Sequence, residues 1–238
     1  MIRLEKVNCI FDGALVAVSD SSLHVQAGET LALLGSSGAG KSTTLKMING
    51  LIRPNRGAIF FEGAPLPYRQ IYATRLKMGY VIQDVGLFPH LNVFKNISIM
   101  ARMLGWKMEK RSACVEELLK LMGLEPRRYL EKYPSQLSGG EAQRVGVARA
   151  LMLDPPCLLM DEPFGALDPI TRNQLQDDFL KLKTKLKKTV VFVTHDVSEA
   201  FKLADRIAIM NQGRLVQCDA PEKIRQHPAN DFVRAFIQ

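Results

Sequence analysis

The 238-residue sequence lacks a hydrophobic run long enough to cross a membrane as a helix. Its longest stretch without a charged side chain runs only from Thr30 to Gly40, whereas a spanning helix needs about 20 apolar residues. Its four cysteines are scattered without metal-ligand spacing, which argues against a cysteine metal site and favours reduced thiols. No secretory leader, internal repeat or low-complexity tract is visible. We therefore expect a globular protein of a reducing compartment.

The composition is that of a folded, basic protein. Hydrophobic residues make up 47% of the chain, which is enough for one compact domain or two lobes. The net charge of +8 suits work beside an anionic membrane surface or a nucleic acid. The lysines of 181–188 are most simply the solvated face of a helix. The net charge alone therefore does not identify the binding partner.

A phosphate-binding loop is the first specific signal. The segment 35–42 fits the pattern G-x-x-x-x-G-K-[ST], between an apolar strand at 30–34 and a helix that begins near Ser42. Glycines let the backbone amides converge on an anion at the helix N-terminus. The alternative is an ordinary glycine-rich turn. The residues expected to contact a nucleotide here are Gly35, Ser36, Ser37, Gly38, Ala39, Gly40, Lys41, Ser42 and Thr43.

Three more uninterrupted apolar runs, at 79–82, 157–160 and 189–193, are typical of a parallel sheet covered on both faces. They end at Gln83, at Asp161 and Glu162, and at Thr194 and His195. Such sheets bind ligands beyond the carboxyl ends of their strands. We therefore expect these side chains at the same edge as the phosphate loop.

These side chains suit phosphate hydrolysis. Asp161 and the hydroxyl of Ser42 are ligands of the kind that Mg²⁺ prefers, and Gln83 offers a further oxygen to the metal or to water. Glu162 is placed to activate the attacking water, and His195 to hold the departing phosphate. The alternatives are a solvated strand end for Gln83, a loop start for the two acids and a core residue for His195.

A second signal lies at 137–141, where Ser138 and Glu141 form the capping box of a helix. A helix start alone does not explain the pair Gly139 and Gly140, because glycine in a helix costs about 1 kcal/mol relative to alanine. Exposed amides at this helix end would bind phosphate.

With these motifs in this order, the chain resembles the ATP-binding cassette family, the ATPase subunits of ABC transporters, over essentially its whole length. The resemblance implies an α/β fold of the P-loop NTPase (RecA-like) type. It has a parallel sheet core, an N-terminal antiparallel β subdomain and an inserted α-helical subdomain. The expected catalytic lobe is 1–90 with 154–238, and the expected helical lobe is 91–153.

The resemblance also assigns roles to residues. It makes Glu162 the catalytic glutamate, His195 the switch histidine and Gln83 the Q-loop residue. The signature is the segment 137–141 followed by Gln143, and the D-loop is 165–168. Their expected nucleotide contacts are Ser138, Gly139, Gly140, Glu141, Gln143 and Asp168. Phe11 is the candidate for stacking on adenine, with a core position in the N-terminal strands as its alternative.

In this family the signature of one cassette covers ATP on the phosphate loop of another. One copy of each motif therefore implies a homodimer, or a dimer with a related cassette, that uses ATP and Mg²⁺. The expected partners are integral membrane permease subunits and, indirectly, a substrate-binding protein, and no nucleic acid. The expected location is peripheral, on the cytoplasmic face of the cell membrane. The segment 87–89 is a candidate contact for the permease, with ordinary packing as its alternative.

The amino-acid sequences of segments 78–90 and 228–233 are similar to those of cassettes that import glycine betaine, choline or carnitine. Importers of amino acids, taurine or nitrate remain alternatives. Soluble ABC ATPases that act on DNA or ribosomes usually carry a coiled-coil insertion or tandem cassettes, which this chain lacks. A small-molecule kinase would not explain Gly139, Gly140 or His195.

Overall fold

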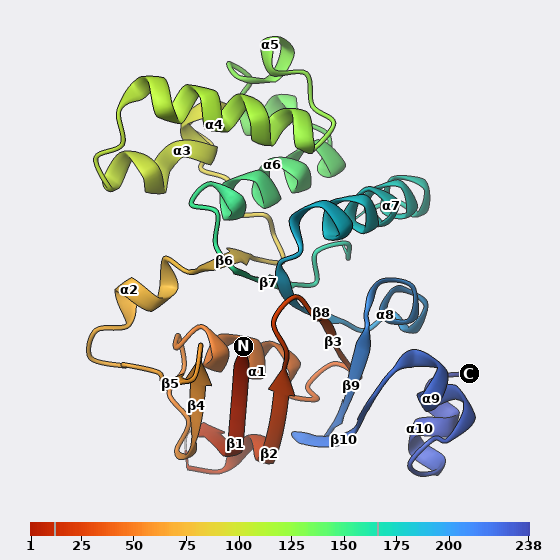
Figure 1. The fold of residues 1–238 in the computed structure, drawn as a ribbon. Coiled ribbons are helices and arrows are strands. Elements are labelled where there is room, and N and C mark those ends of the chain that lie inside the picture. Colours follow the sequence, from red (N-terminus) through yellow and green to blue (C-terminus); the bar gives the residue numbers. More distant parts are fainter. Residues whose placement is uncertain (12, 166) are drawn as a thin grey trace. The chain divides into compact units, whose positions relative to one another are not determined.

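The computed structural model describes residues 1–11, 13–165 and 167–238. The chain divides into two compact units (Figure 1). Unit 1 comprises Met1–Arg75, Leu159–Glu162 and Lys188–Gln238, and unit 2 comprises Leu76–Leu158 and Pro163–Lys187. Strand β7 (Cys157–Asp161) begins in unit 2 and ends in unit 1. Among the described residues, no helix is both long and apolar enough to cross a membrane.

Unit 1 contains an antiparallel sheet with the strand order β2-β1-β4-β5. It also contains strands of a second sheet in the order β10-β9-β3-β8, followed by the end of β7. The strands are β1 (Ile2–Phe11), β2 (Leu15–Val25), β3 (Thr30–Leu34), β4 (Arg56–Phe61), β5 (Ala64–Pro65), β8 (Thr189–Thr194), β9 (Arg206–Asn211) and β10 (Arg214–Asp219). The helices are α1 (Lys41–Ile48), α2 (Ile71–Arg75), α8 (Val197–Leu203), α9 (Pro221–Gln226) and α10 (Asp231–Phe236).

The core of unit 1 lies around β3. Every residue of β3 and of β8 is buried, as their uninterrupted apolar sequences predict. Strand β3 pairs in parallel with β8 on one side and with β9 on the other. The segment 211–213 makes the expected turn into β10, which is antiparallel to β9. The predicted α/β fold with a parallel core and an N-terminal antiparallel sheet is confirmed.

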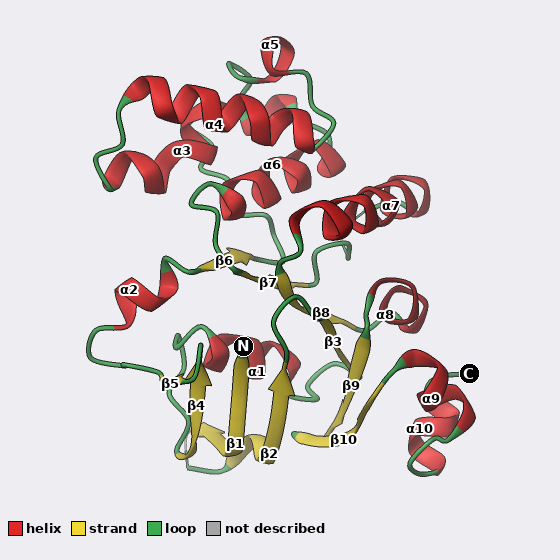
Figure 2. Cartoon of the chain, in the orientation of Figure 1, coloured by secondary structure: helices red, strands yellow, loops and turns green. Residues whose placement is uncertain are grey.

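Unit 2 is mainly helical (Figure 2). Its elements are β6 (Met78–Val81), the first residues of β7, α3 (Val93–Met103), α4 (Met108–Leu121), α5 (Pro126–Tyr129), a 3₁₀ turn at Pro134–Gln136, α6 (Gly139–Leu151) and α7 (Pro169–Leu186). The buried apolar residues of α6 include Val145, Val147, Ala148 and Leu151. Unit 2 also includes α7, whereas the helical lobe expected from the sequence ends at residue 153.

Candidate functional site

The phosphate loop of unit 1 joins β3 to α1, as its sequence predicts. Gly35 and Ala39 are buried, Ser36, Ser37 and Gly38 are exposed, and Thr43 is half-buried in the first turn of α1. Gly40 is the N-cap of α1 with a left-handed φ of 96°. A Cβ atom on Gly40 would lie 2.3 Å from the backbone oxygen of Ala17, so only glycine fits this corner.

Lys41 points into this loop. Its side chain donates hydrogen bonds to the carbonyl oxygens of Gly35 at 2.7 Å and Ser36 at 2.8 Å. Lys41 is only 5% exposed, and burial lowers its pKa, while the charges of Glu162 and Asp161 act in the opposite direction. A phosphate in the loop would be a stronger partner for this ammonium group than neutral carbonyls are.

The two predicted Mg²⁺ ligands meet near the end of β7. The hydroxyl of Ser42 donates a 2.8 Å hydrogen bond to Oδ1 of Asp161, so the two predicted Mg²⁺ ligands are in contact. The described residues contain no cluster of three or more His, Cys, Asp or Glu side chains suited to a metal. One carboxylate and one hydroxyl fit Mg²⁺, which keeps several waters and takes further oxygens from phosphates.

Glu162 and His195 also meet in unit 1. Oε2 of Glu162 lies 3.4 Å from Nδ1 of His195, and the two side chains are 20% and 62% exposed. Glu162 has a φ of 44°, which is uncommon for a residue with a side chain, and its amide donates to the carbonyl of Val193 at 3.1 Å. The hydrogen bond to Val193 of β8 holds this backbone conformation, which in turn sets the direction of the Glu162 side chain. His195 is exposed, so the core position considered for it is wrong.

Phe11 and Gln83 lie at strand ends. Phe11 ends β1 and is exposed, so a core position is wrong for it and stacking on adenine stays a prediction. Gln83 follows β6 in unit 2 and is also exposed. Its predicted roles toward metal and water stay predictions.

The predicted capping box opens α6 in unit 2. Ser138 is the N-cap, its hydroxyl accepts from the amide of Glu141 at 3.3 Å, and a carboxylate oxygen of Glu141 accepts from the amide of Ser138 at 2.8 Å. Gly139 is exposed and Gly140 is buried. A Cβ atom on Gly140 would lie 2.5 Å from Cγ2 of Thr171, so close packing against α7 is a second reason for this glycine.

Two other predicted contacts have structural roles that the sequence analysis missed. Asp168 is the N-cap of α7, and its carboxylate accepts from the amides of Ile170 and Thr171. A side-chain hydrogen bond with Thr171, followed by these amide bonds, lowers the pKa of Asp168. Gln143 is only 3% exposed, whereas Ser138 is exposed. The Gln143 side chain lines a cavity of about 30 Å³ within unit 2. Of the D-loop, residue 166 lies outside the described residues.

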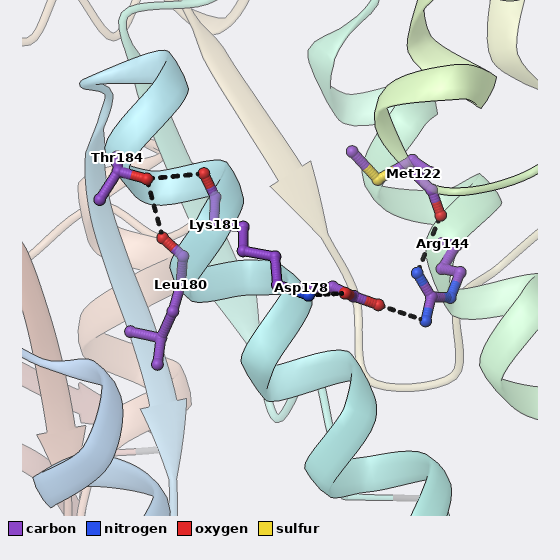
Figure 3. Close-up of polar contacts among 6 residues, drawn as sticks. All are labelled: Met122, Arg144, Asp178, Leu180, Lys181 and Thr184. Carbon is purple, nitrogen blue, oxygen red and sulfur yellow. Dashed lines mark hydrogen bonds and ion pairs between the residues drawn. The ribbon is translucent and has the colours of Figure 1, made fainter.

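Arg144 connects its own helix, α6, to two other helices (Figure 3). Its guanidinium donates to the carbonyl of Met122, at the end of α4, at 2.8 Å, and to Asp178 of α7 at 2.6 Å. Burial tends to raise the pKa of Asp178, but the hydrogen bonds and charges of Arg144 and, after it, Lys181 together outweigh burial and leave that pKa lowered. Lys181 reaches the same carboxylate at 3.3 Å from a position that is 73% exposed.

We expect replacement of Arg144 by methionine to lower the free energy of unfolding by about 2 kcal/mol, because hydrogen bonds to charged groups are worth about 1.5–3 kcal/mol. Lys181→Met is the control and should change it by less than about 1 kcal/mol, since exposed ion pairs contribute little. Urea unfolding measures both. The difference between the two proteins should narrow as the pH falls below about 4 and through the lowered pKa of Asp178, where the carboxylate becomes neutral, and the share of the Met122 hydrogen bond should remain. Equal losses in the two variants would contradict this.

The chain is similar in sequence to known ATP-binding proteins. The profile of the ABC transporter family matches residues 18–165. The chain is 51% identical, over its whole length, to the glycine betaine/carnitine/choline transport ATP-binding protein OpuCA of Bacillus subtilis, of which it covers 62%. It is 48% identical to the osmoprotectant import ATP-binding protein OsmV of Salmonella typhimurium, and covers 63% of that protein. The chain thus spans about three fifths of the length of these curated relatives.

A solved structure is also similar. The ATP-binding cassette MJ0796, in a dimeric post-hydrolysis state bound to ADP and Pi, superposes with a TM-score of 0.81. The two sequences are 31% identical, and the match covers 93% of this chain and 99% of that one.

Proposed function

The chain belongs to the ABC transporter family, and we propose that it is the ATP-hydrolysing component of an importer. The observation that carries this proposal is the arrangement in unit 1. There the phosphate loop, the Ser42–Asp161 pair and the Glu162–His195 pair follow β3, β7 and β8, which are neighbours in the strand order.

The residues of unit 1 have separate proposed roles in ATP hydrolysis. Lys41 and the loop amides bind the phosphates, while Ser42 and Asp161 would hold Mg²⁺, which offsets phosphate charge when bound. Glu162 orients and deprotonates the attacking water, a role worth about 10²- to 10⁴-fold in rate. His195, close to Glu162 and exposed, can reach the departing phosphate. Gln83 is proposed to offer its side-chain carbonyl oxygen to the metal or to the attacking water.

The unit of function is proposed to be a dimer, of two identical chains or of this chain with a related cassette. The signature amides at the start of α6 would contact ATP held on the other chain's phosphate loop. Asp168 would lie at the same interface, and its N-cap bonds fix the start of α7. The dimeric state of the cassette MJ0796 supports this assembly.

The transported solute is proposed to be a quaternary ammonium osmoprotectant such as glycine betaine, choline or carnitine. The names of the relatives OpuCA and OsmV support this class. The partners would be integral membrane permease subunits and, indirectly, a substrate-binding protein, with the chain at the cytoplasmic face of the membrane. Phe88, which is 41% exposed and whose backbone amide donates to Asn96 at 2.8 Å, is a candidate permease contact.

The test is ATP hydrolysis by the complex that co-purifies with the tagged chain, reconstituted in lipid vesicles. We expect glycine betaine, choline or carnitine to be taken up and to raise hydrolysis severalfold, and taurine, nitrate or amino acids to have no effect. The substrate-binding protein must be present on the outer side of the vesicles. Stimulation by one of the other solutes would refute the solute class, and co-purification of ribosomes or nucleic acid without membrane proteins would refute the importer.

A further inference from the structure

Glu141 presents an electrostatic difficulty at the proposed signature site. It lies in the first turn of α6, beside the glycine amides that are proposed to contact a phosphate. The positive end of a helix attracts any anion, so a carboxylate in this turn competes with the phosphate for the same amides. The direction in which this carboxylate points therefore affects nucleotide binding.

The structure shows both carboxylate oxygens of Glu141 in use. Oε2 accepts from the amide of Ser138 at 2.8 Å, and Oε1 accepts a short hydrogen bond from the phenol of Tyr129. These bonds, with a contribution from the charge of Lys132, lower the pKa of Glu141. The carboxylate is therefore charged at neutral pH, and Tyr129 fixes its second oxygen.

Tyr129 itself is firmly placed. It ends α5, is buried, and its amide donates to the carbonyl of Glu125 at 3.2 Å. The segment that follows is tied to the start of α3, because the amides of Val93 and Phe94 donate to the carbonyls of Lys132 and Leu130. The ammonium group of Lys132 lies 4.4 Å from the centre of the Tyr129 ring. The phenol thus has a fixed position from which to hold Glu141.

We infer that Tyr129 is a positioning residue for nucleotide binding, which holds the Glu141 carboxylate away from the signature amides so that they stay open to the phosphate. This inference rests on the proposed function, in which those amides contact ATP on another chain. Without the phenol, Oε1 of Glu141 is left to compete for the amides. With a neutral amide at position 141, Tyr129 has no charge to hold, and its loss should matter little.

The test is a double-mutant cycle of Tyr129→Phe and Glu141→Gln, in the hydrolysis-deficient Glu162→Gln background. Glutamine keeps the capping box and removes the charge. Analytical ultracentrifugation gives the ATP concentration for half-maximal dimer formation. We expect Tyr129→Phe to raise it about tenfold with Glu141 present, as loss of one hydrogen bond to a charged group allows, and less than about twofold once Glu141→Gln has been introduced.

Three controls make the result decisive. Tyr133→Phe, in the same segment but exposed, should have no effect. Tyr129→Phe should leave ATP binding to the monomer unchanged, because the phosphate loop belongs to unit 1. Lys132→Met should act in the same direction as Tyr129→Phe and should also depend on Glu141, so that it serves if the tyrosine variant unfolds.

An equal shift with and without the Glu141→Gln substitution would mean that Tyr129 supports the fold only, and would overturn the inference. No shift in either background would overturn it too. The proposed function fails in a different way, since the Glu162→Gln protein itself would then stay monomeric at every ATP concentration.

Discussion

Glutamine in place of Glu162 is expected to lower steady-state ATP hydrolysis by about 10²- to 10⁴-fold and to leave ATP binding intact. The substitution removes only the group that is proposed to deprotonate water. The amide keeps the size of the side chain and the acceptor beside His195, and the backbone with its φ of 44° is unchanged. The rate at which inorganic phosphate is released measures hydrolysis, and nucleotide binding measured on the same sample shows whether affinity for ATP is retained.

The matched control is Glu222→Gln, which neutralises an exposed acid on α9 of unit 1 and should hydrolyse ATP at the parent rate. Near-parental turnover in Glu162→Gln would show that another group activates the water. A loss of binding together with turnover would instead assign Glu162 to the fold of the site.

Alanine in place of Gly40 is expected to weaken ATP binding on the order of 100-fold, the equivalent of about 2.7 kcal/mol. The new Cβ atom would lie 2.3 Å from the backbone oxygen of Ala17, which cannot move aside as a side chain can. The left-handed φ of 96° adds about 1–2 kcal/mol of strain for any other residue. Both strains are relieved only if the loop leaves its phosphate-binding shape.

Gly38→Ala separates the two causes. Gly38 also has a positive φ, of 76°, but a Cβ atom there would meet nothing within 4 Å. Gly38→Ala should therefore weaken ATP binding only about tenfold, which is the effect of backbone strain alone. The ATP-dependent rise in melting temperature measures affinity in both variants. Equal effects at the two positions would remove the close contact with Ala17 from the explanation.

Local patterns predicted the parts of the site that lie along the chain. The strand, loop and helix around Lys41, the capping box at Ser138 and the turn at 211–213 each follow from residues a few positions apart. The uninterrupted apolar runs predicted parallel strands, and β3 confirms this by pairing with β8 and β9. These elements depend on backbone geometry and burial, which short sequences encode.

Contacts between distant segments could not be predicted in this way. Nothing in the sequence near Tyr129 indicates that it reaches Glu141, and Arg144 has no local signal for Asp178. The packing of Gly140 against Thr171 likewise depends on how α6 meets α7. The N-cap role of Asp168 was predictable, because a proline follows it at the first helical position.

The same contacts explain how the chain divides. Helix α7 belongs to unit 2 because Arg144 and the Gly140–Thr171 contact attach it to α6. The sequence alone placed residues 91–153 in the helical lobe, since the order of the chain carries no sign that α7 joins it.

The most direct test of the account is the mass of the Glu162→Gln protein in solution, measured by analytical ultracentrifugation with and without ATP and Mg²⁺. We predict a monomer without nucleotide and a dimer holding two ATP molecules with it, because the proposed function has each nucleotide bound by the phosphate loop of one chain and the signature of the other. A Glu162→Gln protein that binds ATP fully and remains a monomer at all concentrations would contradict the account.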